Sequence, residues 1–333
     1  MYILGMESSC DETSAAIVEY SDGKFTIKSN IVASQVETHR LYGGVVPEIA
    51  SRAHIEAVSG ITSEALSEAG ITLSDVDCVA VTTHPGLIGA LLVGVNFAKS
   101  LAFANNIPLV SVNHINGHVS AAYLSDGELK APFLALVVSG GHTSIYTCHK
   151  DGELCEIATT RDDAAGEAFD KIGRVIGMPY PGGAALDKLA YEGDAKAVKL
   201  PSPALQGTMD FSFSGIKTAA LNYINSATQR GEEIDRADLA ASYTKTVVDA
   251  IAKQTETALK ETGMKTLALA GGVAANSHLR AKLEGVCRKL GVKFTVPPIS
   301  LCGDNGAMIA AAGCFEYLAG RFADTSLNAS ALD

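Results

Sequence analysis

The sequence lacks C-x-x-C pairs and long hydrophobic runs. Its seven cysteines are scattered as Cys10, Cys78, Cys148, Cys155, Cys287, Cys302 and Cys314. This spacing indicates neither a disulfide framework nor a thiolate zinc site, so we expect reduced and mostly buried thiols. The most apolar stretches, residues 90–95 and 131–138, are interrupted well before the roughly 20 residues that cross a bilayer. We therefore expect no membrane span.

The sequence also has few basic residues. Lys and Arg number 26 against 37 Asp and Glu, and the formal net charge is −11. Such a charge opposes binding of nucleic acid through the overall field of the protein. Contact with a polyanion would need a partner or a local basic stripe, of which the best candidate is Arg280, Lys282, Arg288, Lys289 and Lys293. Such a run is more often the solvated face of a helix.

No basic leader followed by a long apolar segment stands at the N-terminus, so we expect a cytoplasmic protein. The length of 333 residues exceeds what one hydrophobic core usually serves, and this predicts two lobes. Hydrophobic residues make up 47% of the chain, charged residues 19%, and there are 32 glycines. This composition is typical of a compact α/β enzyme with tight turns between strands and helices.

Two segments of the chain follow the same plan. Residues 2–6 and 15–18 are predicted strands around a polar turn, and residues 133–146 repeat this arrangement around residues 139–143. Further strands are predicted at 77–82, 107–112, 266–270 and 294–296, and helices at 47–66, 113–124, 166–176, 181–191, 213–224, 238–262 and 304–317. The repeat indicates a duplication, with two related α/β lobes around a central cleft.

A histidine pair is the first candidate for chemistry. His114 and His118 are spaced i, i+4, so on a helix both imidazoles project from one face and can share a metal ion. The alternative is that both only cap or pack the start of the helix. The metalloprotease pattern H-E-x-x-H requires a glutamate after the first histidine, where this chain has Ile115. Zinc peptidase chemistry is therefore disfavoured.

Asp304 is the candidate third ligand. It follows a strand and a loop and precedes a helix, where Asp most often serves as the N-cap, and this role is favoured from sequence alone. As a ligand from a distant segment, it would leave coordination positions open for a substrate, as in catalytic sites.

Two glycine turns at strand ends indicate a nucleotide site. Residues 137–141 end a strand in Gly140-Gly141, and residues 271–276 repeat the pattern with Gly271-Gly272. Bare backbone amides at such turns can approach a phosphate closely. Each glycine pair alone is weak evidence for a nucleotide site, since glycine pairs more often only make tight turns.

These motifs together resemble the TsaD family, also called YgjD or Gcp. The resemblance is carried in chain order by ESSCDET (7–13), HRLYGGVVPEIASRAH (39–54), PGLIGALLVG (85–94), NHINGH (113–118), VSGGHT (138–143), DDAAGEAFDK (162–171), YPGGAALDKLA (180–190), FSFSGIKT (211–218), GGVAANSHLR (271–280) and CGDNGAMIA (302–310). The motifs cover almost the whole chain. They depart from the family pattern at His84, where Gly is usual, and at Gly303, where Thr is usual.

The resemblance implies an actin-like ATPase fold, the fold of sugar kinases and Hsp70, with two duplicated lobes around a central cleft. It implies an N-terminal lobe of residues 1–128, joined by a C-terminal helix at 305–322, and a C-terminal lobe of residues 129–304. It also implies an acyltransferase. The enzyme would move a threonylcarbamoyl group from threonylcarbamoyl-AMP to the exocyclic amine of the adenosine 3′ of the anticodon, in tRNAs that read codons beginning with A, and release AMP.

The resemblance also assigns residues and partners. The metal, iron(II) or zinc, would be held by His114, His118 and Asp304. Substrate contacts would come from Val137, Val138, Ser139, Gly140, Gly141, Asp170, Gly183, Asp187 and Asn276. The implied partners are a TsaB-like paralogue and a TsaE-like P-loop ATPase. A general base is less defined, because Asp11 and Glu12 are both candidates and neither is fixed by spacing; we take Asp11 as the catalytic candidate.

Two other functions remain open. A small-molecule kinase of the same fold would hold Mg²⁺ with carboxylates, which the histidine pair disfavours. A non-catalytic scaffold would lose the metal residues, which this chain retains at 113–118 and 302–305.

Overall fold

The structure is a computed structural model that describes residues 1–202, 205 and 207–332. The chain divides into two compact units. Unit 1 consists of Met1–Ala131, Lys150–Glu153 and Pro297–Asp333, and unit 2 consists of Pro132–His149 and Leu154–Val296. Residues 297–304, which the resemblance assigned to the C-terminal lobe, therefore pack with unit 1.

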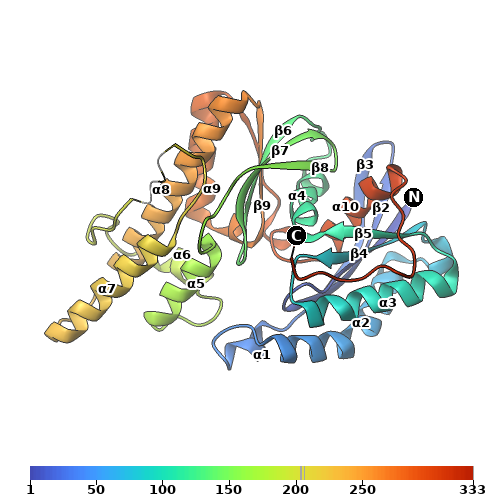
Figure 1. The fold of residues 1–333 in the computed structure, drawn as a ribbon, viewed down its shortest axis with the longest axis horizontal. Helices are drawn as coiled ribbons and strands as arrows, with labels where there is room; N and C mark the ends of the chain where they lie inside the picture. Colours follow the sequence, from blue (N-terminus) through green and yellow to red (C-terminus); the bar gives the residue numbers. More distant parts are fainter. Residues whose placement is uncertain (203–204, 206, 333) are drawn as a thin grey trace. The chain divides into compact units, whose positions relative to one another are not determined.

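Unit 1 is built on a five-stranded sheet with the order β3-β2-β1-β4-β5 (Figure 1). Its strands are β1 (Tyr2–Glu7), β2 (Glu12–Ser21), β3 (Lys24–Ser34), β4 (Cys78–His84) and β5 (Leu109–Asn113). The first three strands are antiparallel neighbours, whereas β1, β4 and β5 run parallel. The sequence predicted β1, β4 and β5 and part of β2, but it did not predict β3.

Helices cover both faces of this sheet because successive residues of a strand point to opposite sides. Ile3 packs with residues of α4 (His114–Ser125) and α10 (Gly306–Leu318). Leu4 and Met6 pack on the other face with residues of α2 (Pro47–Ala69) and α3 (Ile88–Asn105). Figure 1 shows these two helix pairs on either side of the sheet. The short helices α1 (Val36–Arg40), η1 (Leu73–Asp75) and η3 (Ile299–Leu301) complete the unit.

Within the described residues, α3 has the length and apolar composition of a membrane-spanning helix. Part of its apolar composition serves the core, because Leu91, Val95 and Ala98 are fully buried. Val95 and Ala98 belong to the same core cluster as Val79 and Val81 of β4.

Unit 2 is built on a second five-stranded sheet with the order β10-β9-β6-β7-β8. Its strands are β6 (Phe133–Val138), β7 (Thr143–Lys150), β8 (Glu153–Thr159), β9 (Thr266–Ala270) and β10 (Lys293–Thr295). β6 pairs antiparallel with β7 and parallel with β9, which in turn is parallel to β10. The helices are α5 (Ala165–Val175), α6 (Gly182–Leu189), α7 (Ser214–Arg230), α8 (Arg236–Thr262), η2 (Gly272–Ala275) and α9 (Ser277–Leu290).

The two sheets have the same strand order. In each, the central strand pairs antiparallel with the first strand of a following hairpin on one side, and parallel with the first of two later strands on the other. The predicted duplication is therefore confirmed. The sequence signal was the repeated strand, polar turn and strand at residues 2–18 and 133–146.

Candidate metal centre and ligand pocket

The start of α4 positions the two histidines in unit 1. The side-chain oxygen of Asn113 accepts hydrogen bonds from the backbone N–H groups of Ile115, at 2.7 Å, and Asn116, at 3.2 Å. Asn113 is thus the N-cap, and the helix begins at His114. His114 and His118 lie one turn apart, with ring centroids separated by 4.5 Å. Because Asn113 is the N-cap of α4, neither imidazole is needed to cap the helix.

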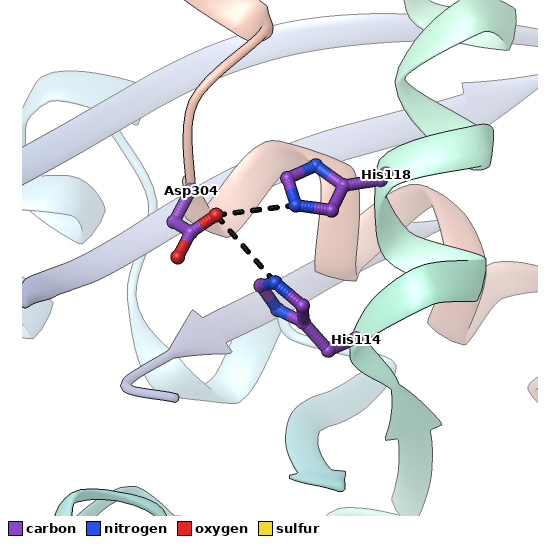
Figure 2. Close-up of side chains that lie close together, drawn as sticks. All are labelled: His114, His118 and Asp304. Atoms are coloured by element: carbon purple, nitrogen blue, oxygen red, sulfur yellow. Dashed lines mark ion pairs between the residues drawn. The ribbon is translucent and has the colours of Figure 1, made fainter. Parts of the chain in front are cut away.

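The carboxylate of Asp304 faces both imidazoles. Its Oδ1 atom lies 3.6 Å from Nε2 of His114 and 3.2 Å from Nε2 of His118 (Figure 2). The N-cap role favoured for Asp304 from sequence is wrong, because Asn305 performs it by accepting a hydrogen bond from the Met308 N–H at 3.0 Å. One ligand atom from each of the two histidines and Asp304 lies within 4.8 Å of the others.

This group of side chains fits a divalent metal ion. His118 is 1% exposed, yet neither of its ring nitrogens makes a hydrogen bond within the described part of the chain. Leaving buried polar atoms unsatisfied is costly, and a cation held by both imidazoles and the carboxylate would remove that cost at Nε2 of His118. Two imidazole nitrogens and one carboxylate oxygen suit both zinc and iron(II), and a three-ligand site leaves positions open.

Glu7 is a residue of this centre that the sequence reasoning missed. It ends β1 with a side chain that is 0% exposed, and its Oε2 atom lies 3.0 Å from Nδ1 of His114. Burial raises the pKa of Glu7, but the charge of His114 and its hydrogen bond outweigh burial, so the pKa lies below its ordinary value. A Glu at the end of a strand has no spacing signal. Only its position in the motif ESSCDET could have identified it.

The two candidate bases lie in the turn after β1. Asp11 is buried, and its backbone carbonyl accepts a hydrogen bond from the Gln35 N–H at 3.0 Å. Glu12 opens β2. Burial, together with the charges of Asp304 and Asp11, raises the pKa of Glu12 to about 9.

Unit 2 contains a cavity of about 270 Å³ at the ends of β6 and β9. It is lined by Gly140, Gly166, Phe169, Asp170, Pro181, Gly183, Ala184, Gly272, Val273 and Asn276. The backbone approaches closely on one side, because a Cβ at Gly166 would lie 2.4 Å from the Ser139 carbonyl oxygen. Sequence reasoning noted the glycine turn at Gly272 but missed Gly166 and Phe169 as lining residues.

Four of the predicted substrate residues line this cavity. Gly140 follows β6, and Asp170 lies on α5 with its Oδ1 atom accepting the Gly183 N–H at 2.8 Å. Asn276 caps α9, because its side-chain oxygen accepts the Leu279 N–H at 2.8 Å. The four residues come from the turn after β6, from helices α5 and α6, and from the N-cap of α9.

Five predicted substrate residues are not among the lining residues. The side chains of Val137 and Val138 are fully buried in β6, and Ser139 holds the following turn by accepting the His142 N–H at 3.1 Å. Gly141 is exposed beside Gly140. Asp187 faces the start of α9, where its carboxylate accepts hydrogen bonds from the Ser277 N–H and hydroxyl and lies 2.8 Å from a ring nitrogen of His278.

Three of the five residues of the candidate basic stripe, all on α9, pair with carboxylates. Lys282 pairs with Asp249 and Lys289 pairs with Glu256. Arg288 pairs with Glu284 on its own helix, and the Arg280 guanidinium donates to the Ala274 carbonyl. This pattern favours the alternative of a solvated helix face over a free site for phosphates.

Comparisons with known proteins identify a close set of relatives. The family model of tRNA N6-adenosine threonylcarbamoyltransferase, TsaD, matches residues 26–311. A curated protein of that description from Clostridium botulinum (strain 657 / Type Ba4) is 53% identical over 98% of this chain and 96% of its own length. One from Geobacillus thermodenitrificans (strain NG80-2) is 53% identical over 99% of this chain and 96% of its own length.

Solved structures agree with the predicted fold class. Full-length HypF in a phosphate- and nucleotide-bound form matches with a TM-score of 0.63 and 15% identity, over 100% of this chain and 47% of that one. A ROK hexokinase from Thermus thermophilus matches with a TM-score of 0.50 and 14% identity, over 96% of this chain and 99% of that one. With the duplicated sheets, these similarities confirm an α/β fold of the actin-like ATPase and sugar kinase type. At such identities they show the fold alone.

Proposed function

Because the chain belongs to the tRNA N6-adenosine threonylcarbamoyltransferase family, we propose that it transfers a threonylcarbamoyl group from threonylcarbamoyl-AMP with a metal held by His114, His118 and Asp304. Family membership makes the chain a transferase that modifies adenosine in tRNA, and the kinase alternative is not favoured. The observation that carries the metal proposal is the buried His118 imidazole, which lacks a hydrogen bond within the described residues and faces Asp304.

The cavity of unit 2 is our proposed adenylate site. Backbone amides at the glycine turn of Gly140 suit an anionic phosphate. The N–H groups of Gly166 and Asn276 already donate to the Ser139 and Val273 carbonyls. The aromatic ring of Phe169 and the apolar Val273 offer a surface for a base, while Asp170 accepts the Gly183 N–H and holds the start of α6 in place. These residues bind and orient the donor.

A metal held by His114, His118 and Asp304 would supply a Lewis acid. In the transfer, the adenosine N6 forms a bond to the carbonyl carbon of the threonylcarbamoyl group, the bond from that carbon to the phosphate oxygen breaks, and AMP leaves with the electron pair. The proton from N6 needs an acceptor. Of the two candidates in the turn after β1, we assign this role to Asp11.

We further propose iron(II) or zinc as the metal, the cytoplasm as the compartment, and the adenosine 3′ of the anticodon in tRNAs reading codons that begin with A as the target. The proposed partners are a TsaB-like paralogue and a TsaE-like P-loop ATPase. The net charge of −11 supports a need for partners in tRNA binding. On α2, a candidate paralogue contact, Ile55 is exposed whereas Val58 and Ile61 face the core.

Mass spectrometry of nucleosides from tRNA tests the proposal. Protein, threonylcarbamoyl-AMP, tRNA and the two partner types should yield threonylcarbamoyladenosine at the adenosine 3′ of the anticodon. His118→Ala should abolish the product and lower bound metal by elemental analysis, while its circular dichroism stays that of the wild type. Stoichiometric metal in the His114→Ala, His118→Ala double variant would show that the ligand assignment is wrong.

A further inference from the structure

Glu7 is a buried carboxylate, and both of its oxygens have hydrogen-bond partners. Its side chain is 0% exposed at the end of β1. One oxygen, Oε1, accepts the Ser9 N–H at 2.5 Å. The other, Oε2, accepts the Thr82 hydroxyl at 2.7 Å and lies 3.0 Å from Nδ1 of His114. Burying a carboxylate is costly unless its oxygens are satisfied, and here three donors satisfy them.

These contacts determine where the proton of His114 lies. Nδ1 of His114 has two partners, the Glu7 carboxylate at 3.0 Å and the Ser9 hydroxyl at 3.1 Å. The hydroxyl can accept or donate, whereas the carboxylate can only accept, so the imidazole donates from Nδ1. In the neutral ring Nε2 then carries a lone pair, and Nε2 is the atom that faces Asp304 at 3.6 Å. Two acceptors that face each other repel unless a cation lies between them. The arrangement presents a lone pair to a metal ion.

The second histidine of the pair lacks such support. Nδ1 of His118 makes no hydrogen bond within residues 1–202, 205 and 207–332. Metal-binding imidazoles almost always donate their other ring nitrogen to a carboxylate, carbonyl or water, which fixes the tautomer and the ring orientation. In this centre that interaction is made at His114, by a residue more than 100 positions away in the sequence.

We propose that Glu7 is the positioning residue of the metal centre, holding His114 as the Nδ1–H tautomer with Nε2 directed at the metal. The inference rests on the proposed assignment of His114, His118 and Asp304 as ligands. Glu7 does not touch the metal or the substrate. It acts through the orientation and proton position of His114.

Glu7→Gln is the informative substitution because it keeps the size of the side chain and removes the symmetry of the carboxylate. If the Gln oxygen faces His114 and Thr82, its NH₂ group opposes the Ser9 N–H. If the NH₂ group faces His114, it favours protonation on Nε2, which blocks the metal. Either orientation of the amide weakens metal binding. Thr82→Val is the matched control, since it removes one hydrogen bond of the same carboxylate and leaves its contact with His114.

Binding of Co²⁺, measured by its absorption spectrum in competition with a chelator, gives the first measurement. We expect Glu7→Gln to raise the Co²⁺ dissociation constant by roughly 10- to 100-fold. Thr82→Val should change it by less than about threefold. Equal losses in the two variants would overturn the inference, because they would indicate a general disturbance of the turn. Unchanged binding in Glu7→Gln would overturn it as well, if His114→Ala abolishes binding.

The second measurement requires no metal. Long-range ¹H–¹⁵N spectra of metal-free protein labelled at histidine report which ring nitrogen of His114 is protonated. We expect Nδ1–H in the wild type and a smaller fraction of that form in Glu7→Gln, because one of the two amide orientations favours protonation on Nε2. Should Glu7→Gln not fold, the wild-type spectrum alone decides, since a His114 ring protonated on Nε2 overturns the inference. If His114→Ala retains Co²⁺, the proposed ligands are wrong, and the tautomer still tests Glu7 separately.

Discussion

Asp304 and Asn305 are chain neighbours with separate roles. Asn305 is 1% exposed, and besides capping α10 its amide donates to the Gly303 carbonyl at 2.8 Å. Asp304 points to the imidazoles instead. The loop therefore supplies the start of a core helix and a candidate ligand from adjacent positions.

This division predicts opposite results for two alanine variants. Asn305→Ala should lower the free energy of unfolding by about 0.5–2 kcal/mol, because a buried cap is lost. Asp304→Ala should lower bound metal and leave the metal-free stability nearly unchanged. Urea denaturation of the metal-free variants and elemental analysis of the proteins as purified would test both. Equal loss of stability in the two variants would contradict the division.

Gly140 and Gly141 give a second prediction about single residues. A Cβ at either position would meet no atom within 4 Å, so the protein itself leaves room for a side chain. Only Gly140 lines the cavity. Gly140→Val should therefore weaken AMP binding about tenfold or more by displacing backbone amides from the phosphate, whereas Gly141→Val should have a smaller effect. Calorimetry with AMP checks this, and equal affinities in both variants would contradict it.

At the scale of elements, α2 is tied to the turn after β1 by a buried histidine. The His54 Nε2–H donates to the Cys10 carbonyl at 3.0 Å, and Nδ1 lies 2.7 Å from the Thr13 hydroxyl. The side chain is 0% exposed. The same turn carries Asp11, so the packing of α2 fixes the backbone around a candidate catalytic residue.

His54 should make stability depend on pH. Burial lowers the pKa of His54 below its ordinary value, so between the two values the unfolded chain binds more protons than the folded one. Stability is then complete above the unfolded pKa of about 6.5 and falls as the pH drops below it. Urea denaturation at pH 7.5 and 5.5 should show a smaller change for His54→Gln than for the wild type. The exposed His149 offers a control, because His149→Gln should behave as the wild type does.

The elements differ in how well the sequence predicted them. β1, β4, β6 and β9 are buried on both faces and read as continuous apolar runs, so they were found. The edge strand β3 and the strand β8 were missed because exposed and half-buried residues alternate along them. Periodicity cannot separate such a strand from a polar loop.

The site was predictable only in part for a related reason. The i, i+4 spacing of His114 and His118 follows from helix geometry, and the spacing alone suggests a shared metal. Asp304 joins them from 186 positions further along the chain (304 − 118), and no local pattern carries that contact. The cavity in unit 2 is lined by four separate segments of the chain, so it could be recognised only from the structure.

For the whole molecule, the net charge predicts how strongly the chain binds tRNA. With a charge of −11 and three of the five residues of its candidate basic stripe paired with carboxylates, the isolated chain should bind tRNA poorly and turn over only with its partners. Filter binding and turnover assays with and without both partners, at a stated salt concentration, test this. Micromolar or tighter binding at physiological salt, with multiple turnovers by the chain alone, would contradict the partner requirement.

The discontinuity of unit 1 has a consequence for biosynthesis. Its sheet is synthesised within the first 131 residues, but α10, which covers one face, follows all of unit 2. At translation rates of about 5–20 residues per second, roughly 10–40 s separate the two. During that time a nascent chain exposes an apolar sheet face to which chaperones can bind. Asp304 is synthesised with the same late segment. A metal ion bound earlier by the two histidines would therefore lack its carboxylate ligand until translation is almost complete.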